Sequence, residues 1–232
     1  MEAGCEASGD AAITVSPGLL AFGDGGFVAC GTQAPPLSVT ITNHTCASEG
    51  FTVELPTGMT YYTLSPSFGT LGPGATQAVQ VTAAAVPVTA GTQGYPGTLS
   101  VTTTSGEGAQ LVSLKTDAYG AIMECPDFGS LVDFGAVPVG QSVQHTLGIT
   151  NAGLAPTTLS FSVLGNGFTV TASDGGPATS IPADPGIGVL VLVTLTPTAV
   201  ESYTGTVYMN LAPGTPQCEQ PLGPAYFSGK GM

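Results

Sequence analysis

Hydrophobic and polar residues alternate with a period of two along most of the chain. Between residues 77 and 82, Val79 and Val81 share one face while Gln80 and Thr82 share the other. This is the pattern of a strand that buries one face and exposes the other. About seven such segments recur in each half, separated by Gly, Pro, Ser or Asn, without a convincing amphipathic helix. The pattern predicts an all-β protein of the β-sandwich type.

The longest apolar stretch covers residues 187–195. It is far shorter than the roughly 20 residues that span a bilayer, so we expect a buried strand and no membrane insertion. Nearly every position of 189–195 is apolar. We therefore expect this strand to be covered on both sides by a neighbouring domain or chain, with the ordinary burial of a central strand as the alternative.

The two halves of the chain share landmarks in the same order. Asn43 and Asn151 are 108 residues apart, and so are the tyrosines at 95 and 203. The Phe-Gly pairs that begin at 22 and 134 are 112 residues apart, so the first half carries about four extra residues between its first two strands. Near-constant separation of this kind indicates an internal repeat. We expect two domains, residues 1–120 and 121–232.

Four motifs follow one another in the second half. They are FGAVPVG at 134–140, ITNAG at 149–153, LTPT at 195–198 and YTGT at 203–206. In these motifs the chain resembles the ASPM-SPD-2-Hydin (ASH) repeat family, of the choice-of-anchor-D-like bacterial surface type, which is related to the major sperm protein and PapD-like folds. The resemblance spans roughly residues 13–231, and the first half departs from it at 26–31. It implies two tandem immunoglobulin-like β-sandwiches of about seven strands each.

Five cysteines stand at positions 5, 30, 46, 125 and 218, and none belongs to a CxxC pair. The repeat suggests disulfides between Cys30 and Cys46 and between Cys125 and Cys218, which would require an oxidising compartment. Five buried reduced thiols are the alternative. Cys5 is the odd one, and inter-chain pairing and dispensability fit it equally well.

Charge narrows the range of partners. Lys115 and Lys230 are the only basic residues, against fifteen acidic ones, and the formal net charge is −13. Nucleic acid is excluded as a partner because binding phosphates needs clustered Lys and Arg.

Residues 1–10 lack the basic start and apolar run of a secretory signal, so the protein is either cytosolic or already processed. The expected disulfides favour a processed, exported protein, and we expect an extracellular or cell-surface location.

The chain offers little material for catalysis. The usual bases are restricted to His44 and His145, and neither lies in a recognisable hydrolase motif. We expect both to be solvent-facing or structural. Glu124 with Asp127, and Asp174 with Asp184, are the carboxylate pairs to consider for Ca²⁺ or glycoside hydrolysis, but neither has EF-hand spacing. We expect no enzyme activity, no cofactor and no metal.

Two functions compete. The first is a subunit of an extracellular fibre, sheath or adhesin stalk, assembled through sandwich edges or ends. Charged residues on an edge strand discourage the addition of another strand, and this chain has few of them. The second is a monomeric module that binds a glycan or a protein through loops such as 57–67 and 172–181. Tyr61, Tyr62 and Phe51 are candidates for an aromatic sugar-contacting face. The sequon at Asn43 permits glycosylation in a suitable host.

Overall fold

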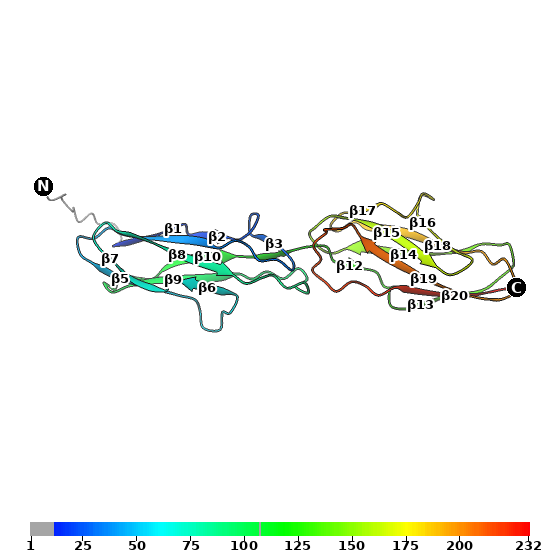
Figure 1. Ribbon diagram of the computed structural model, residues 1–232, viewed down its shortest axis with the longest axis horizontal. Helices are drawn as coiled ribbons and strands as arrows, with labels where there is room; N and C mark the ends of the chain where they lie inside the picture. The colour runs from blue at the N-terminus through cyan, green and yellow to red at the C-terminus, as the bar shows by residue number, and fades with distance from the viewer. Residues whose placement is uncertain (1–11, 107) are drawn as a thin grey trace. The chain divides into compact units, whose positions relative to one another are not determined.

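The computed structural model describes residues 12–106 and 108–232 (Figure 1). Within these residues every regular element is a strand, and the chain divides into two units. Unit 1 comprises Met1–Pro87 and Gln93–Ala118, and unit 2 comprises Val88–Thr92 and Tyr119–Met232. The predicted all-β chain of tandem β-sandwiches is confirmed. The described part of the chain contains no helix of the length and hydrophobicity needed to cross a bilayer.

Unit 1 is a sandwich of two sheets. The four-stranded sheet has the order β1 (Ile13–Ser16), β4 (Leu37–Asn43), β8 (Thr76–Ala83), β6 (Tyr62–Ser65). The five-stranded sheet has the order β2 (Leu19–Ala21), β10 (Gln110–Lys115), β9 (Gly97–Thr103), β5 (Glu49–Glu54), β7 (Phe68–Leu71). A separate short pair joins β3 (Phe27–Ala29) to β11 (Asp117–Tyr119).

Unit 2 repeats the topology of the four-stranded and five-stranded sheets of unit 1 strand for strand. Its four-stranded sheet has the order β12 (Met123–Glu124), β14 (Val143–Asn151), β18 (Gly188–Leu195), β16 (Phe168–Ala172). Its five-stranded sheet has the order β13 (Leu131–Val137), β20 (Ala225–Gly231), β19 (Ser202–Leu211), β15 (Thr157–Leu164), β17 (Ile181–Ala183). The duplicated landmarks therefore correspond to a duplicated fold.

Each sandwich has more strands than the expected seven because its edge segments divide between the two sheets. In unit 1, β1 and β2 are separated by Pro17 and Gly18, and β6 and β7 by Pro66 and Ser67. Proline lacks a backbone N–H and cannot continue a ladder on both sides. The chain leaves one sheet at these prolines and enters the other.

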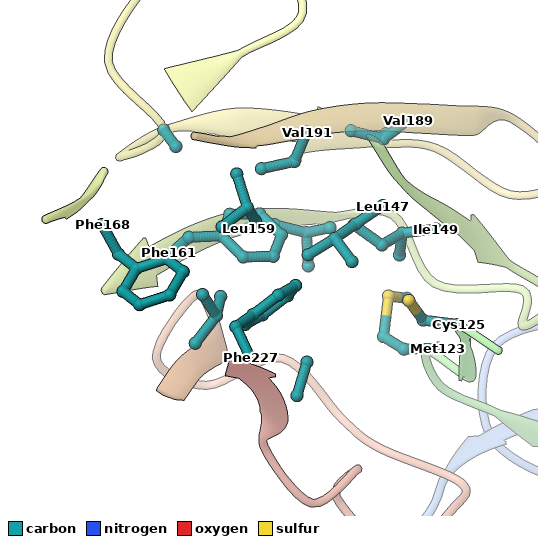
Figure 2. Close-up of a cluster of buried hydrophobic side chains, with 14 of the residues drawn as sticks. Met123, Cys125, Leu147, Ile149, Leu159, Phe161, Phe168, Val189, Val191 and Phe227 are labelled. Atoms are coloured by element: carbon teal, nitrogen blue, oxygen red, sulfur yellow. The ribbon is translucent and has the colours of Figure 1, made fainter. Parts of the chain in front are cut away.

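The core of unit 2 lies between its two sheets. Figure 2 shows Leu147, Leu159 and Val191 gathered around Phe227, with Cys125 and Met123 at one end of the cluster. Phe227 and Leu147 are almost fully buried. Burial of large apolar side chains of this kind stabilises the fold by about 1.5–3 kcal/mol each.

Strand β18 differs from its prediction. Its inward residues, such as Val191 and Val193, are fully buried, but Leu190 on the other face is 52% exposed. β18 lies between β14 and β16 in one layer of a two-layer sandwich, so only one of its faces meets the opposite sheet. The expectation that it would be covered on both sides is wrong within unit 2, and the alternative, ordinary burial of a central strand, is confirmed.

Candidate functional site

The cysteines differ from the predicted pairing. Cys30, Cys46 and Cys218 are disulfide-bonded, whereas Cys125 is a free, buried thiol. The predicted Cys125–Cys218 disulfide is therefore wrong. Cys218 N donates to Ala121 O at 3.1 Å, four residues before Cys125, and an extended chain advances about 3.3 Å per residue. Cys218 is thus held too far along the strand to reach Cys125. The pairing of Cys30 with Cys46 stays a prediction, and Cys5 lies outside the described residues.

Both histidines contact polar neighbours. His44, the residue after β4, has its Nε2 2.8 Å from Thr14 Oγ1 of β1 in an exposed contact. His145 Nε2 lies 3.2 Å from Asp127 Oδ2, and its ring packs beside Phe134 and Phe227. His145 thus attaches the turn after β12 to the edge of the core, which is a structural role.

Of the carboxylate pairs, Asp127 and Asp174 make local side-chain contacts. Asp127 is the partner of His145, and Asp174 Oδ1 accepts a hydrogen bond from Gly176 N at 2.8 Å. Asp184 closes a turn, since its backbone oxygen accepts from Ile187 N. Among residues 12–106 and 108–232, no three His, Cys, Asp or Glu side chains gather as metal ligands would.

The predicted aromatic face does not form. Phe51 is buried in unit 1, and Tyr62 is buried in the same core, in contact with Phe22. Tyr61 stacks on Tyr95 with ring centroids 4.2 Å apart. These side chains are used for packing, and segment 57–67, expected to be a loop, contains strand β6.

The sequon asparagine is also inside the fold. Asn43 is fully buried, and its Nδ2 donates to the backbone oxygens of Ala47 and Leu71 at 2.8 and 3.0 Å. Its Oδ1 accepts from Thr45 N at 2.8 Å. The side chain connects the end of β4 to the end of β7, so it stabilises the sandwich and is not presented to solvent.

Three outer strands, β1, β13 and β17, carry features that discourage strand addition. The amide of Gln110 bonds to Ile13 O and Val15 N on the open side of β1. β17 has Pro182 at its centre, and β13 carries Asp133 beside a bulge. Protected edges of this kind limit association with other chains.

Strand β7 is different. It pairs only with β5, through Phe51–Gly69 and neighbouring pairs, and Val53 N donates to Ser67 O. Backbone groups alternate in direction along an antiparallel strand, so those of Phe68 and Thr70 point to the open side. The Phe68 side chain is 74% exposed, the highest value among the large hydrophobic residues described.

A shallow hollow of about 330 Å³ lies beside β7 on the outward face of the five-stranded sheet. Phe68 borders it, Gly50 and Gly69 lie within it, and the hydroxyl-bearing lining consists of Thr52, Thr70, Thr102, Thr103 and Thr104. We call this the β7 hollow. Sequence analysis missed it because Phe68 and Leu71 lie on opposite faces of one short strand, so alternation does not say which is buried.

Glu49 fixes the rim of the β7 hollow. Its Oε1 accepts hydrogen bonds from Ser105 N at 2.6 Å and from Thr104 Oγ1 at 3.0 Å. Thr104 Oγ1 in turn accepts from Gly50 N at 3.1 Å. The hydrogen bond from Ser105 N is the main reason that the pKa of Glu49 lies below its usual value.

Unit 2 presents an uncharged row of side chains on its five-stranded sheet. Leu131 pairs with Tyr226, Tyr226 with Thr206, and Thr206 with Leu164. Leu131 and Leu164 are 66% and 61% exposed, and Tyr226 is 46% exposed. We call these four residues the unit 2 row. It begins at edge strand β13 and crosses four strands.

Comparison with known proteins gives likenesses of fold. No family model and no curated protein matches the chain. A protein of unknown function from Porphyromonas gingivalis W83 is similar at 18% identity and a TM-score of 0.38, over 95% of this chain and all of that one. The ASH/PapD-like domain 7 of human CEP192 is similar at 13% identity and a TM-score of 0.40, over 49% of this chain and 87% of that one. The periplasmic chaperone SfaE is similar at 10% identity and a TM-score of 0.37, over 95% of this chain and all of that one. The chain itself is a tandem of two β-sandwiches.

Proposed function

We propose that this protein is a non-enzymatic extracellular structural protein of the ASH type, a subunit of a surface fibre, sheath or adhesin stalk. The unit 2 row carries the proposal. It places Leu131 beside Tyr226, and Leu164 on the next strand beyond Thr206, in a single row that starts on the edge strand β13. Contiguous exposed apolar surface of this kind marks interaction sites. The partner that we propose is a second copy of this chain.

The charge distribution supports association through this surface. The chain carries a net charge of −13, and two copies repel each other wherever acidic groups meet. The four side chains of the unit 2 row are uncharged, so contact there avoids that repulsion. Aromatic side chains such as Tyr226 are enriched at the centres of protein interfaces.

The disulfide-bonded cysteines support an extracellular location. Cys30, Cys46 and Cys218 are oxidised, and disulfides persist in oxidising compartments. The histidine contacts support a structural role, because His44 and His145 hold neighbouring segments of the fold.

The test is the solution mass of the whole, non-reduced chain, measured across concentration by analytical ultracentrifugation together with negative-stain imaging. We expect concentration-dependent oligomers or filaments. The double variant L131E/L164E should raise the dissociation constant at least tenfold, because it places two charges in the contact. Leu190→Glu is the matched control, since Leu190 is 52% exposed on the other sheet of the same unit. A monomer at all concentrations, or equal loss in the control, would contradict the proposal.

A further inference from the structure

The β7 hollow has the chemistry of a site for a neutral, hydroxyl-rich ligand. None of its nine lining residues is charged, and five of them are threonines. Each threonine hydroxyl can donate one hydrogen bond and accept two. A charged ligand would find no charge among the lining residues, and a purely apolar ligand would remove water from the exposed hydroxyls of Thr52, Thr70 and Thr102 without replacing it.

Phe68 supplies a flat apolar surface at the border of the β7 hollow, next to its threonine hydroxyls. Its side chain is 74% exposed, although an isolated phenylalanine gains by burial. A sugar ring has apolar C–H groups on its faces and hydroxyls around its rim. Such a ring can lie against Phe68 while its hydroxyls reach Thr52 and Thr102, which are paired directly across β5 and β9.

Gly50 makes room for the ligand on the outward face. A Cβ at Gly50 would lie 2.8 Å from the Thr104 side chain, so a larger residue there would fill part of the hollow or displace its wall. A Cβ at Gly69 would lie 2.7 Å from the ring of the buried Phe51, so Gly69 is required by packing on the core side of the sheet. The backbone groups of Phe68 and Thr70 on the open side of β7 add further donors and acceptors next to the hollow.

Unit 2 provides an internal comparison, because the strand registers identify equivalent positions. Phe51 pairs with Gly69 and Thr103, and Leu159 pairs in the same way with Ile181 and Leu211. Counting from these pairs, Gly50 corresponds to Thr158 and Phe68 corresponds to Ser180. In the same way, Gly69 corresponds to Ile181 and Thr70 corresponds to Pro182. Unit 2 therefore has neither glycine, no aromatic ring at the position of Phe68, and a proline without a backbone N–H at the position of Thr70. The hollow is thus a specialisation of unit 1 and not a consequence of the fold.

We infer that the β7 hollow binds one ring of a neutral polysaccharide, with Phe68 stacked on the face of the sugar and Thr52, Thr70 and Thr102 bonded to its hydroxyls. The site lies on the outward face of a sheet in unit 1. It is separate from the unit 2 row, so the inference does not rest on the proposed function.

The test is a titration of the ¹⁵N-labelled full chain with cellohexaose, maltohexaose and chitohexaose, followed by amide chemical shifts. At least one of these should shift the amides of Thr52, Thr70 and Thr102 with a dissociation constant in the millimolar range or tighter. Phe68→Ala should weaken that binding at least tenfold. Leu111→Ala is the matched control and should leave binding unchanged, because Leu111 is 65% exposed on β10 of the same sheet.

Two further arms separate the alternatives. A hexamer of galacturonate should bind at least tenfold more weakly than the best neutral hexamer, since it is anionic. Repeating the titration in L131E/L164E makes the result independent of self-association through unit 2. The inference is overturned if no neutral hexamer shifts these amides, if Phe68→Ala binds as well as the unchanged chain, or if Phe68→Ala alters only the oligomeric state.

Discussion

Asn43 and Asn151 occupy the same place in the two units and make the same contacts. Each is fully buried at the end of the second strand of its four-stranded sheet. Asn43 Nδ2 donates to Leu71 O at 3.0 Å, and Asn151 Nδ2 donates to Ala183 O at 2.9 Å. Each amide therefore connects the end of one sheet to the outer strand of the other. Neither asparagine has a positive φ, so the side-chain contacts, and not a left-handed turn, account for the residue at this position.

We expect Asn43→Ala to destabilise unit 1 and Asn151→Ala to destabilise unit 2, each by about 2–3 kcal/mol, because several buried backbone groups would lose their partner. Urea unfolding followed by NMR intensities of each unit would show which unit is affected. Asn166→Ala is the control, since Asn166 is exposed. Equal loss in the control, or no loss in either variant, would show that these amides do not stabilise the fold.

The sequon at Asn43 should remain unmodified once the domain has folded. Its Nδ2, the atom that would carry the glycan, is buried and donates within the sandwich. Intact mass measurement after secretion from a glycosylating host should find the unglycosylated chain. A folded, glycosylated product would contradict the position of Asn43.

Two adjacent tyrosines should respond oppositely to loss of the hydroxyl group. The Tyr61 hydroxyl is buried without a hydrogen-bond partner among the described residues, whereas Tyr62 OH donates to Tyr95 O at 2.5 Å and lies 2.9 Å from Thr116 Oγ1. We expect Tyr61→Phe to leave unit 1 equally stable or up to about 1 kcal/mol more stable. Tyr62→Phe should cost about 1–2 kcal/mol because it leaves the buried Thr116 hydroxyl unpaired. Chemical denaturation of both variants compares them directly.

Tyr61 also predicts a loss of stability at alkaline pH. Burial, with a smaller effect of Tyr95, raises the pKa of Tyr61 to about 12 from an ordinary value near 10. Its contribution is fully present below pH 10 and is lost as the pH rises through 12. The loss should be smaller in Tyr61→Phe. If both proteins lose stability equally between pH 10 and 12, the position of Tyr61 is not the cause.

Glu49 predicts an effect at acid pH. Its pKa is lowered in the folded state, so its contribution is present above the unfolded value of 4.5 and is lost as the pH falls through the folded value. The stability of unit 1 should therefore fall less between pH 6 and 3 in Glu49→Gln than in the unchanged chain. The amides of Thr104 and Ser105 should shift over the same pH range. An unchanged pH profile in Glu49→Gln would contradict this assignment.

Alternation of side chains predicted the strands well because one face of each sheet meets the other sheet, as in Val79 and Val81 of β8. The repeat predicted that both halves share a topology, and they do. Disulfide pairing was not accessible in the same way, since it depends on the register between Cys218 and segments far away in sequence. The β7 hollow was missed for a related reason: it needs side chains from β5, β7 and β9 to come together.

The free thiol of Cys125 can report on the opening of unit 2. Burial raises the pKa of this thiol, so little reactive thiolate is present while the core is closed. The other three described cysteines are oxidised and do not react as thiols. The rate at which a disulfide reagent modifies Cys125 therefore measures how often unit 2 opens, without any label being introduced.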